Sequence, residues 1–112
     1  MSLPDTLIAS NRQKVASIAQ DMLNGRVAII NGSRQLAALL HHIDVDEFDE
    51  DFMPFVGIDS ETDNLPTGET RKHWATDALE KKDAEIAAAE AHWRDYALSA
   101  CTRLVARFGS HQ

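Results

Sequence analysis

The segment from Thr76 to Phe108 contains neither Gly nor Pro. Its apolar residues recur at helical spacing: Leu79, Ile86, Ala89, Trp93, Ala97, Ala100, Leu104 and Phe108. Thr76 is a favourable helix cap, and Asp77 places a negative charge in the first turn. The pattern predicts one helix of about 33 residues, about 50 Å long at 1.5 Å per residue. So long a helix in a 112-residue chain must either bend or pack its exposed part against another chain.

Two shorter helices are predicted before it. The first runs from about Pro4 to Leu23, because its apolar residues share one face and Asn24-Gly25 is a good stop signal. The second lies within Arg26 to Ile43, where Asn31-Gly32-Ser33 interrupts the apolar pattern. Either the helix continues and Gly32 lies at a tight helix crossing, or a turn precedes a new helix capped by Asn31 or Ser33. We favour the continuous helix.

The acidic residues cluster in the connector between the second and third helices, from Asp44 to Trp74. Nine of the eighteen acidic residues lie between Asp44 and Asp63: Asp44, Asp46, Glu47, Asp49, Glu50, Asp51, Asp59, Glu61 and Asp63. No Lys or Arg occurs from Gln35 to Thr70. Outside this block eleven basic residues face the other nine acidic ones (18 − 9), so the net charge of −7 is local. Such a segment can attract a basic partner or collect a cation.

The same connector holds an apolar cluster at residues 52–58. Pro54 and Pro66 are predicted to exclude a regular helix there, so Phe55-Val56-Gly57-Ile58 forms at most a short strand. Apolar clusters are unusual in disordered linkers, so we expect the connector to fold over the helices. The predicted fold is a single all-α domain over residues 1–112 with three main helices. The expected core comprises Ile18, Met22, Leu36, Leu40, Phe55, Ile86, Trp93, Ala97 and Leu104.

Composition excludes several function classes. A pI near 5.0 argues against binding nucleic acid, because phosphate contacts need a basic face. No apolar run is long enough to span a membrane, and the segment from Met1 to Asp5 does not have the features of a signal peptide. The lone Cys101 excludes an internal disulfide and fits a reducing cytosol, so a cytoplasmic location is expected. We interpret Cys101 as a small packing residue.

No residue pattern predicts catalysis or a bound cofactor. The alternating carboxylates of Asp59, Glu61 and Asp63 resemble a calcium loop, but its sixth position is Asn64 and its twelfth is Thr70. A turn is therefore the better interpretation. His41 and His42 are neighbours and cannot easily ligate one ion from a helix. We expect no metal and no catalytic residue.

The segment Phe55-Val56-Gly57-Ile58-Asp59-Ser60-Glu61-Thr62-Asp63, with Leu65-Pro66, Gly68 and Trp74 after it, is similar to a family of small, stand-alone, uncharacterised bacterial helical proteins. The likeness extends to Gly25-x-x-x-Ile29-Ile30-x-Gly32 and to Asp83-x-Glu85-Ile86. The resemblance implies a helical fold and brings no activity with it. In size and acidity, without a shared motif, the chain also resembles bacterial immunity proteins, which bind and block toxins.

Two tryptophans and one tyrosine lie near or on the long helix. Trp93 and Tyr96 are expected in the core. Trp74, after Arg71-Lys72-His73, either packs the connector against the helix or acts as a binding anchor.

The favoured function is a non-enzymatic protein-binding module. It would present the nine acidic residues and Trp74 to a basic surface, as an immunity-type inhibitor of a basic bacterial toxin would. The alternative is a carboxylate-dependent metal-binding protein or hydrolase centred on Asp59, Glu61 and Asp63. A homodimer through Ala87, Ala88 and Ala89, with pairing of the nearby Lys81, Lys82, Asp83 and Glu85, is as well supported as a monomer.

Overall fold

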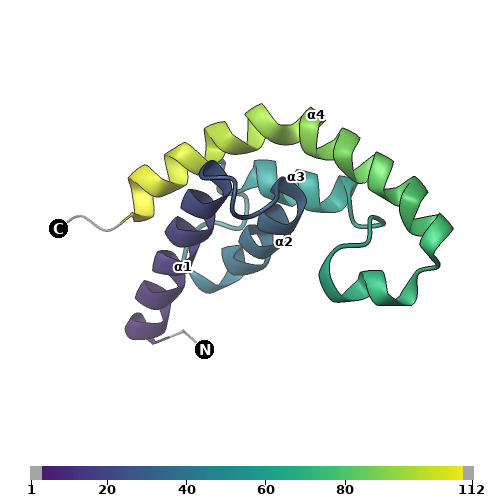
Figure 1. The fold of residues 1–112 in the computed structure, drawn as a ribbon. Helices are drawn as coiled ribbons and strands as arrows, with labels where there is room; N and C mark the ends of the chain where they lie inside the picture. Colours follow the sequence, from purple (N-terminus) through teal and green to yellow (C-terminus); the bar gives the residue numbers. More distant parts are fainter. Residues whose placement is uncertain (1–3, 110–112) are drawn as a thin grey trace.

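The computed structural model describes residues 4–109, apart from the side chains of residues 68–70. These residues form α1 (Asp5–Leu23), α2 (Ile29–Leu39), the 3-10 helix η1 (Leu40–His42), α3 (Met53–Glu61), the 3-10 helix η2 (Gly68–His73) and α4 (Thr76–Phe108). No strand occurs in this part of the chain. The helix α4 arches over the other three α-helices, and its N-terminal part extends beyond them (Figure 1). The all-α prediction is confirmed, but the count of three main helices is wrong because α3 makes a fourth.

The predicted first helix is confirmed as α1. The carbonyl of Pro4, at the N-cap, accepts hydrogen bonds from the backbone N–H groups of Leu7 and Ile8 at 3.0 Å each. Asn24 is the C-cap, and Gly25 follows with φ +76°, a conformation that glycine adopts without steric cost. The helix therefore ends where its stop signal lies.

The second helix runs without a break through Gly32, as favoured from the sequence. An ideal Cβ on Gly32 would lie 2.3 Å from Met22 Sδ, so glycine is what lets α1 approach α2 here. Neither Asn31 nor Ser33 caps α2, because the N-cap position is Ala28. The capping group comes from α4 instead: Glu90 accepts hydrogen bonds from the backbone N–H groups of Ile29 (2.8 Å) and Ile30 (2.7 Å).

The prediction that residues 55–58 form no regular helix, and at most a short strand, is wrong because this segment lies in the helix α3. Pro54 lies in the first turn, where its missing N–H breaks no intrahelical bond, so it starts the helix instead of preventing it. Phe52, Phe55 and Ile58 recur every three residues and are buried against the other helices. The connector thus folds over the helices, as expected. Arg34 on α2 holds the turn of the connector that follows α3. It donates hydrogen bonds to the Leu65 carbonyl (2.9 Å), to the Thr67 hydroxyl (2.7 Å) and to the Thr62 carbonyl.

The core lies between α1, α2, α3 and the C-terminal part of α4. Of the nine expected core residues, six are buried: Met22, Leu36, Leu40, Phe55, Ala97 and Leu104. Ile18 and Trp93 are partly buried and pack against the core, while Ile86 is only half-buried. Tyr96 is 53% exposed, so its placement in the core is wrong.

The helix α1 packs chiefly on the last helix of the chain. Met22 and Cys101 meet there, with their sulfur atoms 3.6 Å apart. Cys101 is buried and fills space in the core, as expected, and burial raises the pKa of its thiol to about 12. The buried residues of α4 are Ala97, Ala100, Cys101 and Leu104, so the part of α4 before Ala97 buries no residue fully.

The helix α4 begins at Thr76 as predicted, but Thr76 is its first helical residue and Ala75 occupies the cap. The preceding Trp74 is 38% exposed, and the Lys82 ammonium lies 5.8 Å from the centre of its ring. No helix in the described residues is both long and apolar enough to cross a membrane.

Candidate functional site

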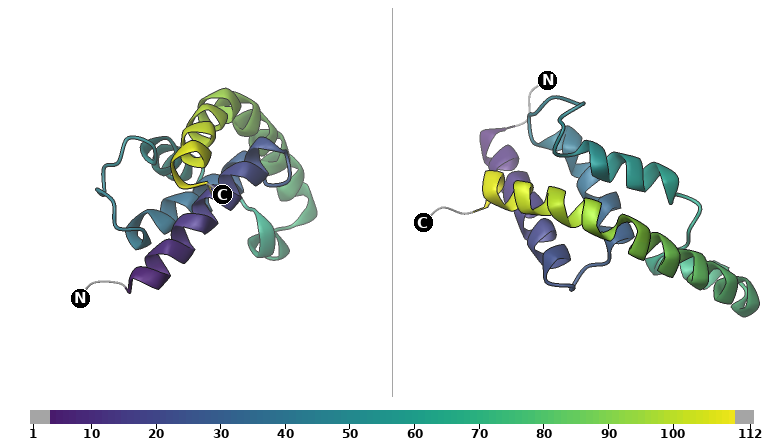
Figure 2. Two further views of the ribbon diagram at one scale, coloured as in Figure 1. Left: turned by 90° about the vertical axis from the view of Figure 1, so that its left-hand side faces the viewer. Right: turned by 90° about the horizontal axis from the view of Figure 1, so that it is seen from above.

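The acidic block does not form one surface. Asp44, Asp46, Glu47, Asp49, Glu50 and Asp51 lie in the loop that enters α3, which we call the acidic loop (residues 44–51). Asp59 and Glu61 lie in the last turn of α3, and Asp63 follows it. Trp74 lies between η2 and α4, and Figure 2 shows that junction on the far side of α3 from the acidic loop. The structure thus separates the nine acidic residues into two groups and places Trp74 at a third position in the fold.

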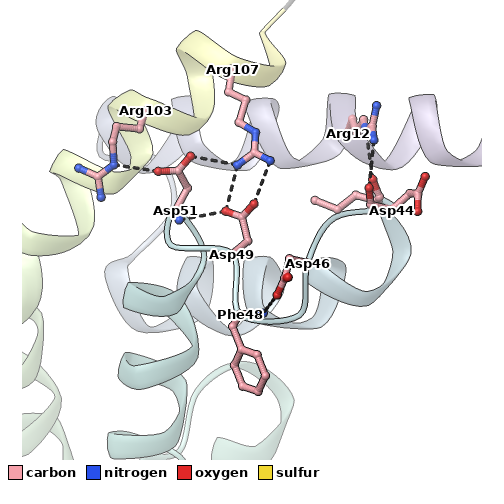
Figure 3. Close-up of polar contacts among 9 residues, drawn as sticks. Arg12, Asp44, Asp46, Phe48, Asp49, Asp51, Arg103 and Arg107 are labelled. Atoms are coloured by element: carbon pink, nitrogen blue, oxygen red, sulfur yellow. Dashed lines mark hydrogen bonds and ion pairs between the residues drawn. The ribbon is translucent and has the colours of Figure 1, made fainter.

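Two polar side chains of α1 bind the chain where it enters the acidic loop, and Figure 3 shows that of Arg12. Asn11 donates to the His42 carbonyl at 3.1 Å. Arg12 donates from Nε to the Ile43 carbonyl at 2.9 Å and from Nη2 to the Asp44 carbonyl at 3.4 Å. These donors satisfy the carbonyl of the last residue of η1 and the carbonyls of the two residues after it. Asp44 has a positive φ of 57°, which Asp tolerates better than most residues, and the chain turns away from α1 there.

Two arginines of α4 bind the end of the acidic loop. Arg107 makes a bidentate pair with Asp49, with Nη1–Oδ1 and Nη2–Oδ2 distances of 2.9 Å each, and its Nη1 also lies 3.0 Å from Asp51 Oδ2. Arg103, one turn earlier, donates from Nε to Asp51 Oδ1 at 3.0 Å. The hydrogen bond from Arg107 lowers the pKa of Asp49. The carboxylates of Asp49 and Asp51 therefore attach the acidic loop to α4.

Phe48 lies at the tip of the loop between these two attachments. Its side chain points to solvent (Figure 3) and is 72% exposed, the most exposed large apolar residue described. The local backbone is held by short bonds: Asp46 Oδ1 accepts from the Phe48 N–H at 2.7 Å, and Asp49 Oδ1 accepts from the Asp51 N–H at 3.0 Å. The phenyl ring is thus displayed on a fixed loop.

The remaining loop carboxylates are available to a partner. Asp44, Glu47 and Glu50 are exposed and make no side-chain hydrogen bond or ion pair with the described residues. The tip of the loop therefore combines one aromatic ring with uncompensated negative charge.

The second acidic group, Asp59, Glu61 and Asp63, makes fewer contacts with the described residues than the acidic loop does. Asp59 lies 3.8 Å from Arg34 Nε, while Glu61 and Asp63 are exposed. Among the side chains that the structure describes, no three of His, Cys, Asp or Glu approach closely enough to hold a metal ion. His41 and His42 are exposed at the end of η1.

An open hollow of about 540 Å³ adjoins the start of the acidic loop. Its charged lining has both signs, with Asp5 and Asp44 facing Arg12 and Arg107. It continues into a second, more apolar hollow of about 600 Å³ between α1 and the end of α4. Since neither sign of charge prevails, the first hollow does not select an anion or a cation.

Sequence reasoning located the acidic residues but missed Phe48 and the arginines that position the loop. One signal was available: Arg103 and Arg107 are four residues apart and so lie on one face of the predicted long helix. A pair of cations on one face can bind two carboxylates of a nearby loop. Which loop they would meet depends on the packing of α3, which the sequence did not reveal.

The family model described as "Protein of unknown function (DUF2489)" matches residues 6–104. The chain belongs to this family. The DUF2489 match covers the whole acidic loop, Arg12 and Arg103, whereas Arg107 and Phe108 lie just beyond it. This agrees with the resemblance to an uncharacterised family, and the family description gives no activity. No curated protein and no solved structure matches the chain significantly.

Proposed function

We propose that this DUF2489 chain is a non-enzymatic protein-binding module that presents the acidic loop to a basic surface of a partner. The observation that carries the proposal is the position of Phe48, 72% exposed at the tip of a loop fixed at both ends by arginines. Aromatic side chains that enter a pocket of the partner supply much of the binding energy at protein interfaces. Phe48 fits the role of such an anchor.

The way the loop is held supports this role. Binding costs less conformational entropy when the contact residues are already ordered. Bonds from Arg12, Arg103 and Arg107 to both flanks provide that order before any partner arrives. Glu47 and Glu50 on either side of the aromatic residue would steer a basic surface toward it and pair with its rim.

An immunity-type inhibitor of a basic bacterial toxin is one protein of this kind. The net charge of −7 supports it, since an acidic loop could obstruct the nucleic-acid site of a nuclease. The alternative of a metal-binding protein or hydrolase at Asp59, Glu61 and Asp63 gains no support from the described residues. We therefore propose no second function.

Site-specific photo-crosslinking in cells of the source organism tests the proposal. A photoreactive residue is placed at Phe48 and, as a control, at Leu7, which is 43% exposed on α1. The expected result is a discrete crosslinked protein with a basic surface at position 48 that is absent at position 7. Glu47→Lys with Glu50→Lys should abolish the crosslink, whereas the matched pair Asp77→Lys with Glu80→Lys on α4 should leave it.

The proposed site would be refuted if positions 48 and 7 gave the same crosslinks. It would also be refuted if the crosslink at position 48 persisted after the charges of Glu47 and Glu50 were reversed. Folding is controlled by a comparison of two phenylalanines. Phe48→Ala should change the free energy of unfolding by less than about 0.5 kcal/mol, because the ring is exposed. Phe52→Ala should lower it by about 3–5 kcal/mol, because that ring is fully buried.

A further inference from the structure

The N-terminal part of α4 offers a second surface, separate from the acidic loop. Before Ala97 the helix buries no residue fully, although it continues for about six turns from Thr76. Its inner side, with the half-buried residues Leu79, Ile86 and Trp93, faces the rest of the chain. Its outer, convex side has no partner in the described residues (Figure 1).

Small residues occupy the middle of this outer side. Ala84, Ala88 and Ala91 are exposed and are spaced by four and three positions, so they share one face. Alanine side chains allow two helices to approach to about 8 Å, the short end of helix-pair distances. Alanines alone, however, do not indicate what covers them.

The charges at the two ends of this face indicate the occupant. Lys81 lies seven residues before Ala88 and Asp95 seven residues after it, on the same face, and both are exposed. Neither forms an ion pair with any described residue. Two copies related by a two-fold axis through Ala88, with antiparallel helices, would place Lys81 of each opposite Asp95 of the other. The face is therefore complementary to itself in charge.

The other charges expected to mediate pairing are already used within the chain. Lys82 pairs with Glu85 at 3.0 Å, and Asp83 pairs with Arg71 at 2.7 Å. Moving the axis by about one turn, to Ala84 or Ala91, brings Lys81 and Asp95 opposite no charge of the other sign. Lys81 and Asp95, which form no ion pair with the described residues, therefore favour the helix register in which the two-fold axis passes through Ala88.

We propose that a second copy of this chain docks on the α4 face of Lys81, Ala84, Ala88, Ala91 and Asp95, forming an antiparallel two-fold dimer with reciprocal Lys81–Asp95 pairs. The acidic loop lies at the other end of α4, where Asp49 and Asp51 bind Arg107. Dimerisation therefore leaves the loop uncovered and would present two loops per particle.

Sedimentation equilibrium with a charge swap tests the dimer. From about 5 µM to about 500 µM, the wild-type mass should rise from 12.4 kDa toward twice that value. Lys81→Glu or Asp95→Lys alone should weaken association about tenfold, because each replaces two attractive pairs with two repulsive ones. The double variant should restore association to within about threefold of wild type, because the pairs are re-formed with exchanged signs.

Lys14→Glu is the matched control, since Lys14 is exposed on α1 and away from this face. It should leave association unchanged. A wild-type mass of 12.4 kDa at every concentration would overturn the proposal. So would single variants that associate like wild type, or a double variant that stays as weak as the single ones.

A cysteine on the axis checks the register independently. Ala88→Cys should form an intermolecular disulfide under mild oxidation faster than Ala38→Cys, an exposed residue on α2. The native Cys101 is buried and does not compete. Equal rates for the two variants would exclude an axis at Ala88.

Discussion

Glu90, in the middle of α4, binds the backbone N–H of Ile30 at 2.7 Å and so caps a helix 60 residues earlier in the chain. Its second oxygen accepts from Ile29 at 2.8 Å. Carboxylates are favoured at helix N-termini because they satisfy free N–H groups and face the positive end of the helix dipole. One side chain thus fixes both the start of α2 and its position against α4.

Glu90→Ala should lower the free energy of unfolding by about 1–2 kcal/mol, because two N–H groups at the start of α2 lose their acceptors. Glu90→Gln should lose less, since one amide oxygen can still accept. Urea unfolding followed by circular dichroism measures both. Glu80→Ala, an exposed glutamate of the same helix, should have little effect, and an equal loss in that variant would contradict the capping role.

Gly32→Ala should destabilise the protein by about 1–3 kcal/mol, because its Cβ would lie 2.3 Å from Met22 Sδ in a packed core. Gly57→Ala is the matched control: this helical glycine is exposed, and a Cβ would meet no atom within 4 Å. There alanine should stabilise by about 0.5–1 kcal/mol through its helix propensity. Thermal unfolding of the two variants should shift in opposite directions.

Acid should weaken the attachment of the acidic loop to α4. The folded-state pKa of Asp49 lies below its ordinary value of 3.8 because Arg107 donates hydrogen bonds to the carboxylate. The resulting stability is present above pH 3.8 and is lost as the pH falls through the folded-state pKa. The urea concentration at the midpoint of unfolding should therefore decrease as the pH is lowered from about 6 to about 2.

Asp49→Asn should flatten this pH dependence and lower stability at neutral pH by about 1 kcal/mol, because Arg107 is itself partly exposed. Some slope should remain, since Arg71 also lowers the pKa of Asp83. Glu50→Gln, at an exposed position of the same loop, should leave the profile unchanged. An unaltered profile in Asp49→Asn would show that the pair with Arg107 does not contribute.

Cys101 should resist thiol reagents in the folded protein. The side chain is fully buried, and burial raises its pKa to about 12, so almost no thiolate is present at neutral pH. Labelling with iodoacetamide should therefore proceed only as fast as the protein opens, and should become rapid in urea. Rapid labelling without denaturant would contradict the packing of Cys101 against Met22.

The elements predicted correctly are those whose signals are local. α1 ends at Asn24-Gly25, and α4 extends over a segment without Gly or Pro, since these residues determine where helices stop. The helix α3 was missed because Pro54 was weighed as a helix breaker, although the first turn tolerates it. Tyr96 was misplaced because helical spacing gives the face of a residue but not whether another element covers that face.

The candidate site was predictable in part for the same reason. The acidic composition of residues 44–51 can be read directly from the chain. The exposure of Phe48 and the use of Asp49 and Asp51 by Arg107 depend on contacts between segments 56–58 residues apart. Contacts between residues so far apart in the chain cannot be predicted from a local sequence pattern.

The packing of α1 against α4 has a consequence for how the chain is made. A ribosome releases the buried residues of α4 about 80 residues after those of α1, which takes roughly 4–16 s at typical rates of 5–20 residues per second. Until then, Val15, Ala19 and Met22 have no Ala97, Cys101 or Leu104 to cover them. The nascent chain thus carries an uncovered apolar stripe until α4 emerges from the ribosome. Such a stripe is suited to chaperone binding, and the core closes only once α4 is free to pack.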